Sequence, residues 1–144
     1  MLVVVAIIGV MAGIAFPSVS SGIDSVRLSA STHRVASFLN AAVSLSERRQ
    51  EPVQVVISPK ENLILLRSAD PGFERRLKLP DGVILEEVFP APADNFETAT
   101  TILLLPGATA PGVAIQLANR HGTRRIVRLD PMTGFPRVES VVAQ

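Results

Sequence analysis

The chain has 144 residues, of which 47% are hydrophobic, a net charge of +1 and no cysteine. This length leaves room for one domain of ordinary size, and the lack of cysteine excludes both a disulfide framework and a cysteine nucleophile. The charges are unevenly spread, because the tail from residue 120 is basic whereas residues 51–119 carry an acidic excess.

The first sixteen residues, Met1 to Phe16, are uncharged and apolar, and Pro17 follows them. As a helix these residues would measure about 24 Å. A membrane-spanning helix needs about 20 residues, or roughly 30 Å, so this segment is slightly short. A secretory signal peptide would carry positive charge before the apolar core, and none precedes it here. A helix that is apolar on every face would need cover on every side, for which a soluble domain of this size has little capacity. We therefore expect a membrane helix that also packs against similar helices.

Small residues in this segment would let neighbouring helices approach closely. Gly9 and Gly13 stand four residues apart, with Ala12 and Ala15 beside them. Pro17 lacks an N–H group and is expected to kink the helix without ending it. The residues predicted to contact the membrane or neighbouring helices are Leu2, Val3, Val4, Val5, Ile7, Ile8, Gly9, Met11, Gly13, Ile14, Phe16 and Pro17.

The segment MLVVVAIIGVMAGIAFPSV resembles the N-terminal segment of type IV pilins and type II secretion pseudopilins. In that family a methylation motif, Gly or Ala followed by Phe-Thr-Leu-Ile-Glu, precedes an apolar run that ends in proline. If Met1 is placed directly after the family's glutamate, Pro17 falls on the family's helix-bending proline. The leader, the cleavage site, the methylated phenylalanine and the glutamate are not in this sequence, so processing and methylation stay open. The resemblance implies a membrane and filament role for residues 1–17.

From Asp24 onward the apolar residues recur at helical spacing. Leu28, Val35 and Ala42 alternate with a second series at three- and four-residue steps, which predicts one apolar stripe on a helix. Pro52 is expected to stop this helix. The second series consists of Ser31, Phe38 and Leu45.

After Pro52 the pattern favours short strands separated by turns rich in Pro, Gly, Asn and Asp. The expected strands are Val53 to Ser58, Leu63 to Arg67, Leu77 to Leu79, Val83 to Phe89, Thr101 to Leu105, Val113 to Ala118, Arg125 to Leu129 and Arg137 to Val142. Pro90 to Thr100 interrupts the series as a loop of unusual length, which favours function or mobility. We predict a long helix packed on antiparallel sheet.

Later segments are also similar to this family. The phrase SERRQEPVQVVIS, the hairpin around Asn119 to Gly122 and the terminal DPMTGFPRV resemble minor pseudopilins of the H type and the related minor pilins of the FimT/FimU kind. The resemblance implies an α+β, type IV pilin-like fold, in which a long kinked N-terminal helix packs on an antiparallel β-rich C-terminal domain. The expected organisation is a transmembrane and filament-core helix at 1–23, an amphipathic helix at 24–50 and a β-rich periplasmic domain at 51–144.

Residues for catalysis are scarce, and we expect neither an enzyme nor a bound cofactor. His33 and His121 are the two histidines of the chain, and both fit ordinary surface positions. The chain contains no GxSxG, HExxH or glycine-rich phosphate motif. Asp94, Asn95 and Glu97 are the one compact group of candidate oxygen ligands for calcium, but their spacing does not fit an EF-hand loop. A solvated loop is the preferred interpretation, with no metal site.

The basic tail supports a second hypothesis. Its candidate DNA or partner surface consists of Arg120, His121, Arg124, Arg125, Arg128 and Arg137. Arginine forks suit phosphate recognition, and on a strand Arg124 and Arg128 would share one face. No aromatic residue interleaves these arginines, so a stacking platform for single strands is lacking. The preferred interpretation is a solvated strand whose charge is balanced by the acidic middle of the domain.

The sequence and the resemblance together favour a minor pseudopilin of a type II secretion system. It would sit in the inner membrane as a single-pass protein with its C-terminal domain in the periplasm, and would assemble with other pseudopilins and the secretion machinery into a pseudopilus that drives protein export. No small-molecule substrate is expected. The alternative is a minor type IV pilin whose basic C-terminal surface binds DNA during uptake.

Overall fold

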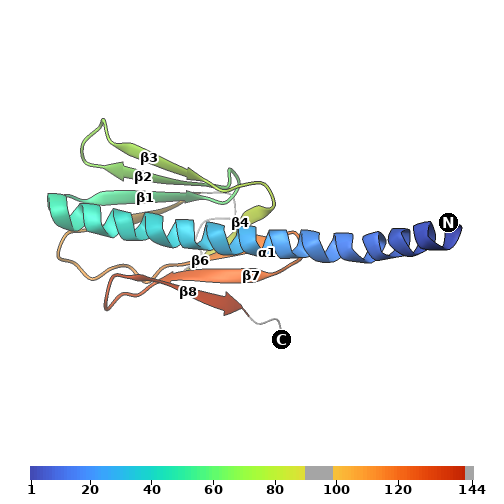
Figure 1. The fold of residues 1–144 in the computed structure, drawn as a ribbon. Coiled ribbons are helices and arrows are strands. Elements are labelled where there is room, and N and C mark those ends of the chain that lie inside the picture. Colours follow the sequence, from blue (N-terminus) through green and yellow to red (C-terminus); the bar gives the residue numbers. More distant parts are fainter. Residues whose placement is uncertain (90–98, 142–144) are drawn as a thin grey trace.

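The chain folds as one long helix followed by eight strands (Figure 1). The computed structural model describes residues 1–89 and 99–141, without the side chains of residues 15–18, 20 and 21 in the helix. The expected loop at Pro90 to Thr100 and its Asp94, Asn95 and Glu97 therefore lie largely or wholly outside the described residues, as does Val142.

The helix α1 runs from Leu2 to Arg49. It ends where Gln50 takes a left-handed conformation with φ of 53°, and Pro52 follows two residues later, as the sequence predicts. Arg48 and Arg49 lie in the last turn, where positive charge is favourable beside the negative end of the helix dipole. The kink at Pro17 falls among residues whose side chains are not described, so it stays a prediction, as does the division into segments at residue 23.

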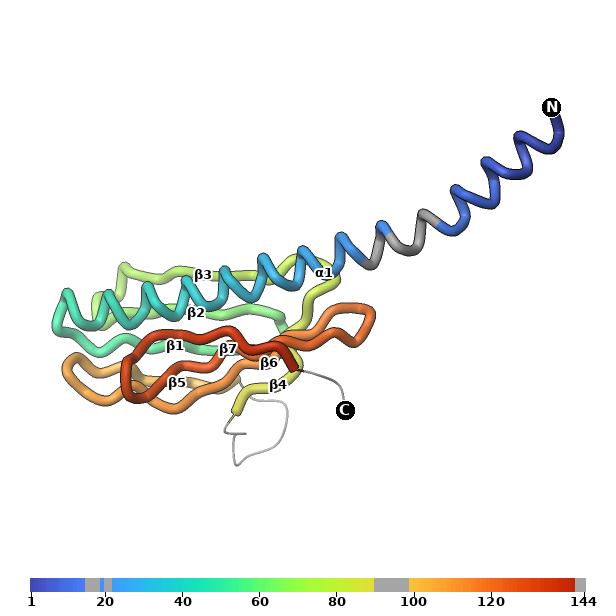
Figure 2. The backbone as a smooth tube through the Cα atoms, turned by 60° about the horizontal axis from the view of Figure 1, so that its bottom comes forward, coloured from blue at the N-terminus to red at the C-terminus, as the bar shows by residue number. Residues whose placement is uncertain are grey.

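The first part of α1 projects beyond the strands (Figures 1 and 2). Its described apolar side chains from Met1 to Ile14 are exposed, and Ile8, for example, is 62% exposed. No helix among the described residues combines the length and the apolar character that a bilayer crossing requires.

The second part of α1 carries the apolar stripe. Leu28, Val35 and Ala42 are fully buried, as expected. The stripe is rotated slightly from the predicted one, since Leu39 is 3% exposed whereas Phe38 and Leu45 are partly exposed beside the core. The helix contacts strands of both sheets, so its line of buried side chains is set by packing against both.

The strands form two antiparallel sheets of four strands each. The first has the order β3-β2-β1-β5 and the second β4-β6-β7-β8. Their bounds are β1 Val53–Ser58, β2 Leu63–Ser68, β3 Glu74–Lys78, β4 Val83–Phe89, β5 Thr100–Leu104, β6 Ala114–Asn119, β7 Arg124–Leu129 and β8 Pro136–Val141. The predicted strands are confirmed within one or two residues, except that β3 begins three residues earlier than expected.

Backbone hydrogen bonds close the predicted turns. The N–H of Asn62 donates to the carbonyl of Pro59 at 3.2 Å, and that of Gly122 donates to Asn119 at 3.2 Å. Gly134 donates to Asp130 at 2.8 Å, and its φ of 73° is one that glycine adopts without strain. These turns join neighbouring antiparallel strands, which fixes their register.

One apolar core joins the helix to both sheets. Its fully buried side chains come from α1 (Leu28, Val35), from the first sheet (Val53, Val55, Ile57, Ile64) and from the second sheet (Ile115, Leu117, Val127). Alternate residues of β1 are buried, as expected for a strand with one face on the core.

Candidate functional site

The exposed apolar part of α1 is the first candidate surface. Its described members among the predicted contact residues, from Leu2 to Ile14, lie on every side of a helix that has left the domain. A Cβ added at Gly9 or Gly13 would meet no atom within 4 Å, so both glycines leave the helix surface open to a close neighbour. Phe16 and Pro17 belong to the helix, but their side chains are not described. This surface requires an apolar partner or a lipid environment, because exposed aliphatic area is costly in water.

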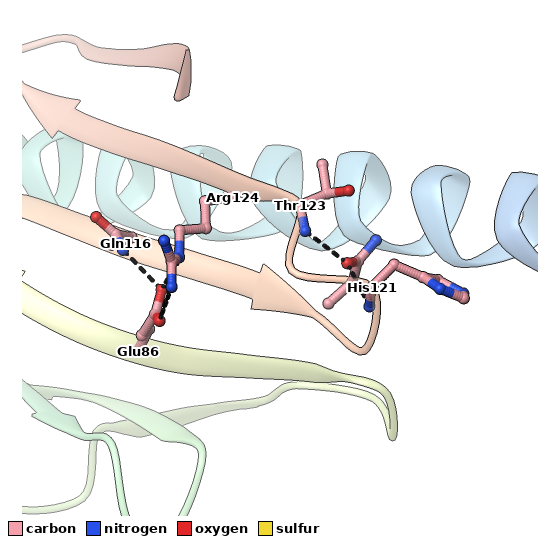
Figure 3. A network of polar contacts seen from close by, with 6 residues as sticks. Glu86, Gln116, His121, Thr123 and Arg124 are labelled. Carbon is pink, nitrogen blue, oxygen red and sulfur yellow. Dashed lines mark hydrogen bonds and ion pairs between the residues drawn. The ribbon is translucent and has the colours of Figure 1, made fainter. Parts of the chain in front are cut away.

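The basic tail is the second candidate surface, and some of its residues have acidic partners whereas others have none among the described residues. Arg124 of β7 reaches across β6 to Glu86 of β4. Its Nε lies 2.9 Å and its Nη2 3.0 Å from the two carboxylate oxygens of Glu86 (Figure 3). Gln116, on β6 between them, donates from Nε2 to the same carboxylate at 2.6 Å. The hydrogen bond from Gln116 lowers the pKa of Glu86, and the charge of Arg124 lowers it further, against a raising effect of burial.

Three more of the predicted site residues have acidic partners. Arg137 Nη2 lies 3.1 Å from Asp130 Oδ2, and Arg128 Nη2 lies 3.8 Å from Glu139 Oε2. His121 Nε2 lies 2.9 Å from Asp24 Oδ2 on α1. Within the described chain, Arg120 and Arg125 form no such pair. Four of the six residues of this candidate surface therefore have an acidic partner, but of these partners only Glu86 belongs to the acidic middle of the domain, which was expected to balance the tail.

The turn that carries His121 is held by a buried amide. Asn119, at the end of β6, accepts hydrogen bonds at its Oδ1 from the N–H groups of His121 and Thr123, each at 3.0 Å. Figure 3 shows this hairpin beside α1, with His121 extending toward the helix. These two hydrogen bonds hold the β6–β7 turn, and the contact between His121 and Asp24 joins the turn to α1.

A cleft of about 1070 Å³ lies at the opposite end of the domain, between the end of α1, the β5–β6 loop and the β7–β8 turn. Glu47 and Arg48 are the ionisable side chains in its lining. Glu47 Oε1 accepts a hydrogen bond from the N–H of Gly107 at 3.2 Å, which fixes the loop that forms one wall. Among the described residues this lining offers no nucleophile with an adjacent base.

His33 is exposed on α1, away from His121. Within the part of the chain that the structure describes, no three His, Asp or Glu side chains lie close enough together to hold a metal ion.

A second hollow surface was not predicted from the sequence. It lies between α1 and β3, where exposed arginines surround apolar side chains. The sequence does contain a pattern that marks its helix side, because Arg34, Ala41 and Arg48 recur at seven-residue spacing and so share one face of the helix. The strand that forms its other wall begins with Glu-Arg-Arg, which hides it from an apolar strand pattern.

No protein-family profile matches the chain, and no curated protein matches it. Among solved structures, the minor pseudopilin EpsH from the type 2 secretion system of Vibrio cholerae matches with a TM-score of 0.62, covering 79% of this chain and 97% of that chain. The two chains share a fold. At 10% sequence identity, this likeness shows the fold alone.

The likeness confirms the α+β, pilin-like fold that the N-terminal resemblance implied. It does not distinguish an H-type pseudopilin from a minor pilin of the FimT/FimU kind.

Proposed function

We propose that this chain is a minor pseudopilin of a type II secretion system, of the H type. It assembles with other pseudopilins through its N-terminal helix into a pseudopilus that drives protein export. The observation that carries the proposal is the apolar half of α1, residues 1–23, whose described apolar side chains are all exposed and which continues without a break into the head. The fold shared with EpsH supports the same assignment.

Before assembly, the apolar half of α1 lies in the inner membrane and the β-rich domain lies in the periplasm. This part of the proposal rests on the uncharged character of residues 1–17, because a polar group is costly in the hydrocarbon region and none is present in these side chains. Methylation of an amino terminus stays an implication of the resemblance, since the family's methylated residue does not occur in this sequence.

The DNA-uptake alternative gains no support from the geometry. Duplex binding draws its affinity from basic groups that neutralise phosphates, whereas Arg124 and Arg137 each face a carboxylate at hydrogen-bond distance. Four of the six residues of this surface lie beside a carboxylate, so part of its charge is already balanced within the domain.

The assembly role is tested by crosslinking from single cysteines, which is direct because the chain has no cysteine of its own. Ile8→Cys and Met11→Cys place a thiol on the exposed apolar helix, and Asp81→Cys places one on an exposed turn of the head. We expect oxidation of intact cells to join the helix positions, but not residue 81, to cysteines in the helices of other pseudopilins.

A charged variant at the same position tests whether the crosslink depends on the apolar helix contact. Ile8→Glu puts a charge into the proposed helix contact, and we expect it to remove the crosslink from Met11→Cys and to abolish export of secreted proteins. Equal crosslinking from residues 8, 11 and 81, or full export by the Ile8→Glu strain, would contradict the proposed role.

A further inference from the structure

Two hollows lie next to each other between α1 and β3, and we call them together the α1–β3 groove. Arg34, Ala41 and Arg48 lie on its helix side, and Phe73, Arg75 and Leu77 on its strand side. It consists of two hollows of about 300 and 490 Å³ that share lining residues. From Ala30 to Arg49 it follows about 28 Å of helix at 1.5 Å per residue, enough for an extended segment of several residues.

The floor of the groove is apolar. Leu66 of β2 is almost fully buried there, and Phe38, Leu45 and Leu77 are partly exposed into it. Ala41 lies in the lining of both hollows, and its small side chain leaves the middle of the groove open. Partly exposed apolar side chains in a concave surface gain free energy when a partner's apolar groups cover them.

The rim is positively charged and lacks acidic partners. Arg34, Arg48, Arg49 and Arg75 are exposed, and within the described chain none of them forms an ion pair. Some other exposed arginines do have an acidic partner, as Arg67 and Arg76 have in Glu74 at 3.1 and 2.7 Å. Four uncompensated guanidinium groups around one apolar floor make a site that is complementary to carboxylates.

Phe73 organises part of this rim. The guanidinium carbon of Arg49 lies 5.0 Å from the centre of the Phe73 ring, and that of Arg75 lies 5.5 Å from it. Both distances are within the range of cation–π attraction. The ring thereby holds an arginine of α1 and an arginine of β3 at one end of the groove, with their N–H donors free for an incoming anion.

We propose that the α1–β3 groove binds an acidic segment of a partner protein that also carries aliphatic side chains. The aliphatic groups cover Phe38, Leu45 and Leu77, and the carboxylates accept hydrogen bonds from the rim arginines. This surface lies on the head and is separate from the apolar half of α1, so the inference does not depend on filament assembly.

Nucleic acid is a poorer match to the same groove. Backbone phosphates make no use of an apolar floor, and binding of single strands uses exposed aromatic rings as stacking platforms. The ring of Phe73 already lies against two guanidinium groups. The apolar floor therefore favours a protein segment over a polynucleotide.

The test measures fluorescence anisotropy with the full chain in neutral detergent micelles, which cover the apolar half of α1. The probe is a fluorescein-labelled ten-residue peptide of alternating Glu and Leu, compared with the same peptide carrying Gln in place of Glu and with a labelled DNA duplex. We expect the acidic peptide to bind, the Gln peptide to bind at least about tenfold more weakly, and the affinity for the acidic peptide to fall as salt rises.

Three variants locate the site. Arg34→Gln with Arg48→Gln should weaken binding of the acidic peptide at least about tenfold, and Ala41→Glu should abolish it by filling and charging the groove. Arg125→Gln with Arg128→Gln removes the same number of charges from β7 and should leave binding unchanged. Far-UV circular dichroism of each variant checks that the fold is retained.

Three results would overturn the proposal. They are no binding of the acidic peptide at low salt, equal loss of binding in the groove and β7 variants, and binding of the duplex but not the peptide in a way that the groove variants weaken. None of these results bears on the crosslinking of the N-terminal helix, so the two proposals fail separately.

Discussion

Asn62 joins the two sheets through both ends of its side-chain amide. It lies in the turn between β1 and β2, where its Nδ2 donates to the carbonyl of Val83 at 2.7 Å and its Oδ1 accepts from the N–H of Leu85 at 2.8 Å. Both partners belong to β4 of the other sheet. Its φ of 55° is a left-handed conformation that asparagine tolerates better than most residues. Asn62 thus fits the left-handed backbone conformation of the turn and also satisfies two backbone hydrogen-bonding groups of β4.

Replacing Asn62 separates these two contributions. Asn62→Ala should lower the free energy of unfolding by about 2–4 kcal/mol, because it leaves two backbone groups of β4 without their partner and puts a Cβ in the left-handed region without a compensating bond. Asn62→Gly should cost about 1–2 kcal/mol less than the alanine variant, since glycine adopts this φ freely. Urea unfolding followed by far-UV circular dichroism measures both, as the chain lacks Trp and Tyr. Equal costs for the two variants would show that the backbone conformation contributes nothing.

At the scale of the element, α1 is one helix with two different environments. Toward its end it buries a stripe of side chains against both sheets, whereas toward its beginning every described apolar side chain is exposed. Helices in folded proteins gain most of their stability from tertiary packing rather than from intrinsic propensity. The two halves of α1 should therefore respond differently to the same kind of truncation.

Two alanine substitutions test this difference. Leu39→Ala should cost about 2–5 kcal/mol of unfolding free energy, because it leaves a cavity at a side chain that is 3% exposed. Ile8→Ala should change the stability of the domain by less than about 0.5 kcal/mol, since that side chain touches nothing within the domain. Thermal unfolding of both variants in the same neutral detergent gives the comparison. A destabilisation by Ile8→Ala as large as that by Leu39→Ala would contradict a helix divided in this way.

At the scale of the whole molecule, charge pairs stabilise the fold within and between its elements. Among the described residues, three carboxyl groups have a lowered pKa. For Glu74 the first cause is the hydrogen bond from Arg76, for Glu86 the hydrogen bond from Gln116, and for Asp130 the hydrogen bond from the backbone N–H of Met132. A lowered folded pKa means that the folded state holds the ionised form more strongly than the unfolded chain does.

This direction fixes the pH dependence of stability. The three groups contribute fully above the ordinary carboxyl pKa of about 4 and lose their contribution as the pH falls through their lower folded values. We expect the melting temperature to be level near neutral pH and to fall below about pH 4. Glu86→Gln should be less stable than the parent at pH 7 and should show a smaller fall in acid. A Glu86→Gln variant that lost as much stability in acid as the parent would contradict a contribution from this carboxylate.

Much of the fold was predictable because its signals are local. Pro52 closely follows the end of α1, alternating residues mark β1, and turns such as Pro59 to Asn62 carry residues that favour tight reversal. The start of β3 was missed because its residues Glu74 to Arg76 are exposed, so they lack the apolar alternation that marks a half-buried strand. The separation into two sheets was missed as well, since pairing of strands distant in the chain leaves no local pattern.

The sequence by itself determined that an apolar helix leads into an α+β domain, because the hydrophobic run, the helical period and the strand period are all properties of neighbouring residues. Tertiary structure alone decided which charges remain available. Arg124 meets Glu86 across 38 positions of sequence and His121 meets Asp24 across 97, so part of the charge of the basic tail is balanced within the domain. Arg34, Arg48, Arg49 and Arg75 lie beside apolar side chains instead and form no ion pair within the described chain. A charge is balanced by what lies within a few ångströms of it, and only the folded chain determines those distances.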